Sequence, residues 1–168
     1  MSNVSLHAVC APTFLRMLKN LSAMLAKGEA HAKAKNFDAS VLLNDRLAPD
    51  MFTLTRQIQI ATDHAKGTMA RLAGTPAEVI EDKETTVAEL QARIAKVMAI
   101  VEGFKPEQLD GSEKREITIK IPNAELKFNG LDFVNTWALP NFYFHVTMAY
   151  AILRHNGVEL GKRDFLMS

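Results

Sequence analysis

Hydrophobic residues recur at intervals of three and four along most of the chain, which is the spacing of helices with one apolar face. In the first of four such stretches, the apolar stripe runs from Leu6 to Leu25. We expect this helix to stop or bend near Gly28, with residues 29–37 as a second piece that continues it.

Two further helices are predicted in the middle of the chain. One is expected to begin at Pro49, because proline suits a first helical turn, and to close at Gly74. The next should begin at Thr86, which forms a capping box with Glu89, and should end at Gly103. The connectors between the helices are rich in Asn, Asp, Gly and Pro, as loops are.

The spacing of apolar residues then changes to every second position. In the stretch KREITIKIPNAELKF, apolar and polar residues alternate on both sides of Pro122-Asn123. This alternation predicts a short β-hairpin with one apolar face at about residues 115–129. A two-stranded ribbon is marginally stable alone, so the hairpin should lie against the helices.

The last helical region is interrupted by Pro140. Residues 131–138 and 140–155 form either two helical pieces or one helix kinked at the proline, with Gly157 as the C-cap. Four amphipathic helices predict an all-α, up-down four-helix bundle, with the small hairpin inserted before the last helix. We expect one domain over residues 1–168.

Composition and charge narrow the classes of function. With 48% hydrophobic and 23% charged residues, the chain has the composition of a soluble globular protein, and its net charge of +1 comes without a basic block. We therefore expect no binding to nucleic acid or to a membrane surface. No apolar run is long enough to span a bilayer, and the N-terminus lacks the features of a signal peptide. The single cysteine, Cys10, excludes an intrachain disulfide and fits the cytoplasm.

The candidate chemistry lies in the last helix. Asn141 and His145 are four residues apart, on a face that also carries Met148 and Ile152. A buried imidazole and a buried amide must each find a partner, or cost roughly 1–3 kcal/mol apiece. His64 is the other histidine in the middle of a helix, and a bundle could bring it to His145 in the interior.

Simple structural roles stand beside each of these candidates. The motifs HExxH, HxxxH, GxGxxG, GxSxG and the P-loop are all absent, so no motif selects a reaction. His64 and His145 could be ordinary surface or core histidines. Asn141 follows Pro140, where a polar side chain can satisfy backbone groups near a kink. Cys10 lies on an apolar stripe and is expected to be a buried, inert thiol.

Two long segments resemble a known family. They are LAPDMFTLTRQIQIATDHAKGTMARLAG and WALPNFYFHVTMAYAILRHNGVELGKRDFL. Both are similar to a bacterial family of uncharacterised function that is placed in the DinB/YfiT-like superfamily of candidate metalloenzymes. The resemblance covers nearly the whole chain. It implies a bundle in which one histidine of the second helix and an HxxxH pair of the fourth bind a divalent metal, and some members of the superfamily are thiol-dependent transferases.

Carried over to this chain, the resemblance makes His64 and His145 metal ligands and places Asn141 where the first histidine of the HxxxH pair would stand. An amide oxygen is a weak, neutral ligand for zinc or nickel, which prefer imidazole or thiolate. Asp63 could add a carboxylate, but it points about 100° away from His64 on the helix. The resemblance therefore gives His64, Asn141 and His145 as the candidate metal ligands. No cofactor follows with certainty, and a divalent ion such as zinc or nickel is the metal that such a site would take.

Two functions follow from these observations. We favour a bundle that is metal-free or binds metal weakly, and that acts by binding a small ligand or by association, because a Met-rich, aromatic interior suits such a pocket. The alternative is a divalent-metal-dependent enzyme that uses His64 and His145, for which the resemblance implies thiol-dependent transfer. The resemblance also implies a homodimer. The substrate and the pathway do not follow from the sequence.

Overall fold

The first helix of the computed structural model, which describes residues 5–167, is a single long one. α1 spans Leu6–Ala34, and the hydroxyl of Ser5 caps its start by accepting from the backbone N–H of Ala8. The expected stop near Gly28 is wrong, because the glycine serves packing instead. A Cβ atom at Gly28 would lie 2.8 Å from Cδ2 of Leu153, so the missing side chain lets the last long helix approach α1 closely.

The second long helix starts later than predicted. After the short helix α2 (Ser40–Asn44), α3 spans Leu54–Ala73, so the predicted start at Pro49 is wrong. The start is set by Thr53, whose hydroxyl accepts from the backbone N–H of Arg56 at 3.4 Å and so satisfies a free donor of the first turn. Gly74, at φ +71°, ends the helix as predicted.

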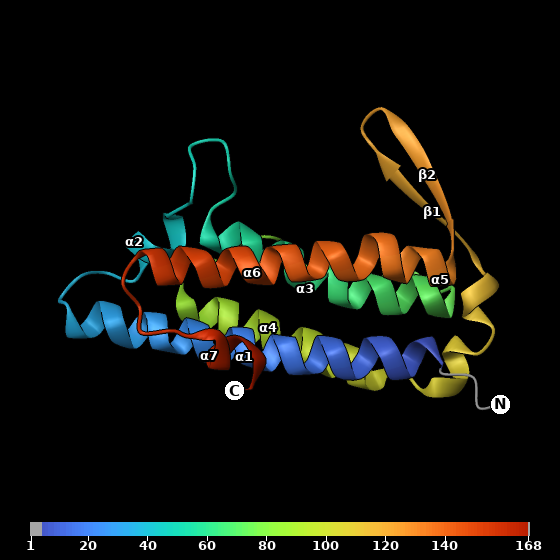
Figure 1. The fold of residues 1–168 in the computed structure, drawn as a ribbon, viewed down its shortest axis with the longest axis horizontal. Coiled ribbons are helices and arrows are strands. Elements are labelled where there is room, and N and C mark those ends of the chain that lie inside the picture. Colours follow the sequence, from blue (N-terminus) through green and yellow to red (C-terminus); the bar gives the residue numbers. More distant parts are fainter. Residues whose placement is uncertain (1–4, 168) are drawn as a thin grey trace.

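Figure 1 shows the third long helix, α4, and the direction in which each of the four long helices runs. α4 spans Val87–Gly103 and begins with the predicted capping box of Thr86 and Glu89. The segment 74–86 returns along the bundle between α3 and α4, so these two helices run in the same direction, opposite to α1 and the last long helix (Figure 1). The predicted four-helix bundle with a hairpin before its last helix is confirmed, while the parallel course of α3 and α4 departs from a strictly alternating up-down order.

The hairpin lies where the alternating pattern predicted it. Two 3₁₀ turns, η1 (Pro106–Leu109) and η2 (Ser112–Lys114), lead to β1 (Glu116–Ile121), which pairs antiparallel with β2 (Ala124–Asn129). Its base packs on the bundle, where the ring of Phe128 contacts Phe133 and Trp137. Its tip projects away from the helices (Figure 1), contrary to the expectation that the whole hairpin lies against them.

The last helical region is continuous through Pro140. α5 (Gly130–Asp132) is followed by the π-helical segment η3 (Phe133–Ala138) and then by α6 (Leu139–His155). The wider π turn changes the hydrogen-bond register just before the proline, which lacks an N–H, so the helix is not broken there. Gly157, at φ +84°, follows the end of α6 as predicted.

The apolar faces of the four helices enclose one core. Phe14 of α1 and Phe142 of α6 meet edge to face at its centre, with ring centroids 4.8 Å apart. Cys10 is fully buried as expected, and burial raises the pKa of its thiol to about 12. No helix within residues 5–167 is both long and apolar enough to cross a membrane.

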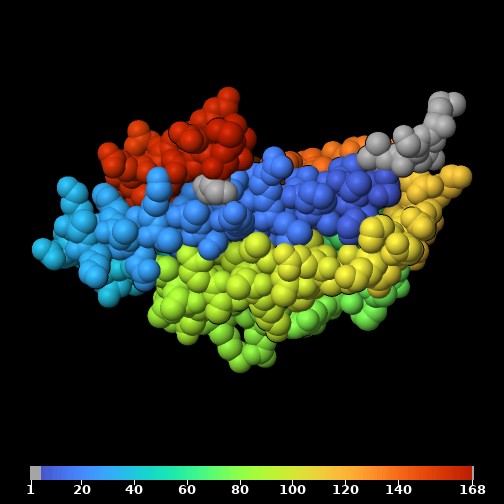
Figure 2. Space-filling model, turned by 90° about the horizontal axis from the view of Figure 1, so that it is seen from below, coloured from blue at the N-terminus to red at the C-terminus, as the bar shows by residue number. Residues whose placement is uncertain are grey.

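The chain ends with a short helix on the outside of α1. α7 covers Lys162–Leu166, and Figure 2 shows this end of the chain lying along α1, with α4 on the other side of that helix. Asn20 donates a hydrogen bond to the carbonyl of Phe165 at 2.7 Å, and Lys27 pairs with Asp164 at 2.6 Å. These contacts fix α7 to α1.

Candidate functional site

His64 of α3 and His145 of α6 come together between these two antiparallel helices. Their ring centroids are 5.8 Å apart and the ring planes differ by 18°, so the imidazoles are nearly parallel. His145 is 8% exposed, whereas His64 is half-buried at the edge of the helix pair. The structure therefore joins two of the three predicted site residues, which lie 81 positions apart in the sequence.

A buried glutamine orients His145. Oε1 of Gln57, on α3, lies 2.7 Å from Nδ1 of His145, and Nε2 of Gln57 donates to the backbone carbonyl of Phe52 at 3.2 Å. Because the amide nitrogen is committed to that carbonyl, Oε1 must accept, and Nδ1 of His145 must carry the hydrogen. The Nε2 atom of His145 is left with its lone pair.

Sequence reasoning missed Gln57. Its position in the sequence could have indicated a place in the site, because Gln57 lies seven residues before His64 and thus on the same face of α3. A glutamine on a face that packs against another helix needs a partner there, and His145 is that partner.

Both imidazoles are neutral at pH 7. Burial lowers the pKa of His64 to about 4, with smaller contributions from His145 and from the charge of Arg71, and with Asp63 acting in the opposite direction. Burial also lowers the pKa of His145 to about 4, assisted by the charge of Arg56. The ring of His64 therefore offers one N–H and one lone pair, whereas His145, whose N–H is donated to Gln57, offers the lone pair of Nε2.

Asn141, the third predicted site residue, is engaged with the backbone. Its side-chain amide nitrogen donates to the carbonyl oxygen of Trp137 at 2.7 Å, in the π-helical turn before Pro140. This is the structural role that a polar residue can take next to a helix irregularity. Nδ2 of Asn141 is thus committed to Trp137, and Oδ1 is the atom that it could offer to a metal.

Asp63 points away from the histidine pair, toward α4. Its Oδ1 atom lies 2.9 Å from Nη2 of Arg93 on α4 and 3.0 Å from Nζ of Lys66. Two cations therefore hold this carboxylate in place. Asp63 does not complete the site next to its neighbour His64, in agreement with its predicted direction on the helix.

Arg93 is the centre of a buried polar network that sequence reasoning also missed. Its side chain is 1% exposed, and its Nε, Nη1 and Nη2 atoms all have hydrogen-bond or ion-pair partners. These partners are Thr62 Oγ1 at 2.8 Å, Asp63 Oδ1 at 2.9 Å, Asp82 Oδ1 at 3.0 Å, Glu84 Oε1 at 3.0 Å and the carbonyl of Glu81 at 3.2 Å. The network fastens the segment 74–86 to α3 and α4.

The donor set does not fit a tight zinc or nickel site. Within residues 5–167, no three His, Cys, Asp or Glu side chains lie close enough to hold a metal ion. What remains is two imidazoles and the amide oxygen of Asn141. Structural and catalytic zinc sites use at least three strong protein ligands, so this set is one ligand short.

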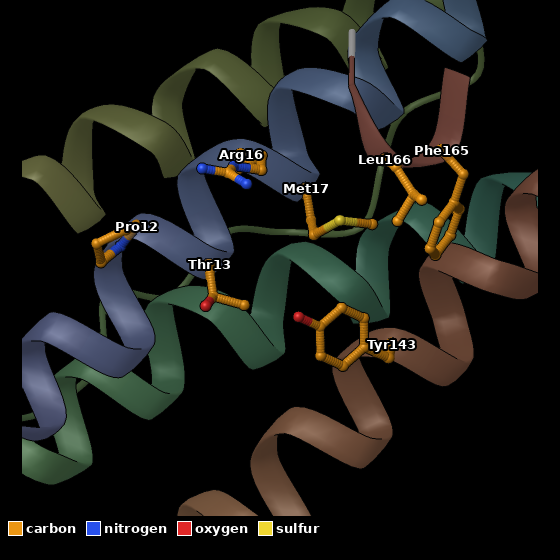
Figure 3. Close-up of a pocket in the computed structure, with 7 residues that line it drawn as sticks. All are labelled: Pro12, Thr13, Arg16, Met17, Tyr143, Phe165 and Leu166. Atoms are coloured by element: carbon orange, nitrogen blue, oxygen red, sulfur yellow. The ribbon is translucent and has the colours of Figure 1, made fainter. Parts of the chain in front are cut away.

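A separate hollow lies on the other side of α6. It has a volume of about 300 Å³ and opens between α1, α6 and α7, as Figure 3 shows. Met17, Phe165 and Leu166 line it with apolar surface, and Tyr143 directs its hydroxyl group into it (Figure 3). Neither histidine of the pair belongs to this lining, so the hollow and the histidine pair are two distinct features.

The fold and the histidine pair define this molecule as a DinB-like bundle. The crystal structure of a DinB family member protein from Shewanella denitrificans is similar to it, with a TM-score of 0.88 and 46% sequence identity. The similarity covers 97% of this chain and 92% of that chain. Residues 6–166 match the family described as the domain of unknown function DUF1993, and the chain belongs to that family. No curated protein matches the sequence.

Proposed function

We propose that this protein binds a small ligand at the pair formed by His64 and His145, and that the pair holds a divalent metal weakly or not at all. The observation that carries the proposal is the parallel arrangement of two neutral imidazoles, one of them fixed by Gln57. The N–H of His64 can donate a hydrogen bond and the free Nε2 atom of His145 can accept one, so the pair can bind a polar group that has both capacities.

The surroundings of the pair favour a ligand with an apolar part. The ring of Phe144 is 51% exposed and stands edge to face against His145, with ring centroids 5.3 Å apart. His64 has no hydrogen-bond partner among the residues that the structure describes, so its ring nitrogens are available to a ligand. A polar group on the imidazoles and an apolar body on Phe144 would use both features.

The alternative function, a divalent-metal-dependent enzyme, is supported by a different observation. A histidine that binds a metal usually donates its other ring N–H to a carbonyl or carboxylate, as His145 does to Gln57. Against this alternative stands the missing third ligand, since Asn141 donates to Trp137 and Asp63 is held by Arg93. If such an enzyme exists here, thiol-dependent transfer is the reaction class to assay.

Metal content separates the two proposals. The protein should be purified without an affinity tag and analysed by elemental mass spectrometry, before and after incubation with zinc or nickel and desalting. We expect well below one metal ion per chain. His145→Ala is the informative variant, and His155→Ala is its matched control on an exposed turn of the same helix. About one ion per chain, lost in His145→Ala and kept in His155→Ala, would favour the enzyme.

Ligand binding is tested directly by a screen of small polar aromatic compounds. NMR signals of the ring protons of His64 and His145 report on binding at the pair. We expect some compounds to shift both signals in a saturable way, and the His64 signal to lose this response in His145→Ala. A screen in which no compound affects either histidine contradicts the proposal.

We also propose association of two copies of the chain. The exposed side chains of Tyr143 and Leu166, 38% and 43% accessible, lie together at the hollow shown in Figure 3 and offer apolar surface. Light scattering at micromolar concentration should give twice the chain mass of 18.6 kDa. A monomeric mass over the whole concentration range would exclude this association.

A further inference from the structure

Gly67 and Arg71 follow His64 along the same face of α3, three and seven residues later. Gly67 is buried, and a Cβ atom built on it would lie 2.6 Å from Nη1 of Arg71. The guanidinium group therefore occupies the space that a side chain at position 67 would fill. Long side chains on a helix point back toward its N-terminus, and here that direction leads toward His64.

Arg71 differs from the other cations on this part of α3. Arg56 pairs with Asp82, and Lys66 pairs with Asp63. Arg71 has no hydrogen-bond or ion-pair partner among residues 5–167. Its charge nevertheless reaches the histidine pair, because it contributes to the lowered pKa of His64. The site thus has an unneutralised positive charge at one side.

We propose that Arg71, positioned by Gly67, makes the site formed by His64 and His145 selective for ligands that carry one carboxylate group. One unpaired guanidinium matches one carboxylate in charge and in its two parallel N–H donors. The neutral imidazoles then bind a second polar group of the same ligand. The inference rests on the proposed function, and it adds the chemical class of the ligand.

A helix-end role for Arg71 is the competing explanation. The residue lies in the last turn of α3, where a cation interacts favourably with the helix dipole whether or not a ligand exists. Gly67→Ala separates the two roles, because it leaves the charge in the last turn but displaces the guanidinium from its place over residue 67. The far end of a flexible side chain can move away, so the variant should fold normally.

The test compares benzoate with benzyl alcohol, which has the same ring and no charge. Titrations followed by the ring-proton NMR signals of His64 and His145 should show benzoate binding at least tenfold more tightly. Gly67→Ala and Arg71→Gln should each reduce this difference to less than threefold, with benzyl alcohol affinity unchanged. Arg16→Gln, which changes an exposed arginine at the hollow on the other side of α6, should retain it.

A second measurement needs no ligand. The charged groups that act on His64 are Arg71 and Asp63, besides His145 itself. Removing or displacing the Arg71 guanidinium should therefore raise the pKa of His64 in both Arg71→Gln and Gly67→Ala. An unchanged pKa in both variants would show that Arg71 does not lie beside His64, and would overturn the inference.

The binding outcomes distinguish the inference from the proposed function. If benzoate and benzyl alcohol bind the unmodified protein equally, the preference for a carboxylate is wrong while ligand binding at the histidines stands. Tighter binding of inorganic phosphate than of benzoate would also overturn the preference, because the site would then favour a dianion. If none of the three probes shifts either histidine signal, both the inference and the proposed function fail.

Discussion

Oε1 of Gln57 lies 2.7 Å from Nδ1 of His145, and this hydrogen bond crosses from α3 to α6 inside the bundle. It joins a residue whose amide is fixed by the Phe52 carbonyl to a histidine that is almost fully buried. The bond therefore determines which nitrogen of His145 carries the proton, and it contributes to the packing of the two helices.

Replacing Gln57 by leucine should destabilise the protein. The variant leaves the buried N–H of His145 without its acceptor, so we expect the free energy of unfolding to fall by about 1–3 kcal/mol in urea titrations. The double variant Gln57→Leu with His145→Leu removes both polar groups and should recover most of the loss. If the double variant is no more stable than the single one, the hydrogen bond is not the cause.

Stability should fall as the pH is lowered from about 6.5 to about 4. In the folded chain the pKa of both His64 and His145 is about 4, whereas an unfolded histidine titrates near 6.5. Between these values the unfolded chain binds protons that the folded chain excludes, so acid favours unfolding, by up to roughly 3 kcal/mol per histidine. The pH dependence vanishes about one pH unit above 6.5, where the unfolded histidines no longer bind protons.

The control for this pH dependence is His64→Gln, which should show a flatter profile in urea unfolding between pH 7 and pH 5. The lower limit of pH 5 keeps carboxylates out of the measurement, since Asp45 and Glu84 have lowered pKa values and lose their contribution only in stronger acid. Equal slopes for the variant and the unmodified protein would mean that His64 is not buried in its neutral form.

Asn141→His should create a stronger metal site. The substitution supplies an imidazole four residues before His145, where it can reach the same point in front of the helix. We expect zinc affinity, measured by calorimetry, to rise at least tenfold over the unmodified protein. The variant loses the hydrogen bond to the Trp137 carbonyl, so it should also be less stable by about 1 kcal/mol. In the double variant Asn141→His with His145→Ala, the gain in zinc affinity should be lost. If the gain persists, zinc binds at another place.

Arg93→Met should be among the most damaging single substitutions. It leaves the largely buried Glu84 without its cation, and removing one partner of a buried ion pair typically costs about 3–5 kcal/mol. Asp63 and Asp82 are more exposed and keep Lys66 and Arg56 as partners, so they add little to this loss. Arg93→Lys keeps the charge but offers three N–H donors instead of five, so its loss of stability should be intermediate. Both are measured by urea unfolding.

Lys96→Met is the matched control on α4. Lys96 pairs with Glu78, and both side chains are about half exposed, so the loss should stay below about 1 kcal/mol. A similar loss of stability for Lys96→Met and Arg93→Met would mean that burial does not increase the contribution of the Arg93 network to the free energy of unfolding.

Local signals explain which parts of the fold could be predicted. The capping box of Thr86 and Glu89 and the alternation around Pro122 are complete within a few residues, and the corresponding helix start and hairpin are found where expected. Pro49 and Gly28 were misinterpreted because each residue type has two common uses. Proline suits a loop as well as a first turn, and glycine allows close helix packing as well as helix ends.

The candidate site was predictable to a lesser degree. His64 and His145 could be selected because each lies on or beside the apolar stripe of its helix. Gln57 and Arg93 were missed, since a polar residue on such a stripe gives no indication of which distant residue will be its partner. The role of Asn141 depended on the π-helical turn before Pro140, which no local spacing indicated.

Residue spacing within one element predicted the amphipathic helices and the hairpin, and it selected His64 and His145 as candidates for the site. The three-dimensional structure was needed to show that the two rings lie parallel, that Gln57 orients His145, and that Gly67 makes room for the guanidinium group of Arg71. The physical reason is that the first two relationships depend on how α3 and α6 are rotated and spaced. The third depends on the rotamer of one long side chain, which spacing along the sequence leaves open.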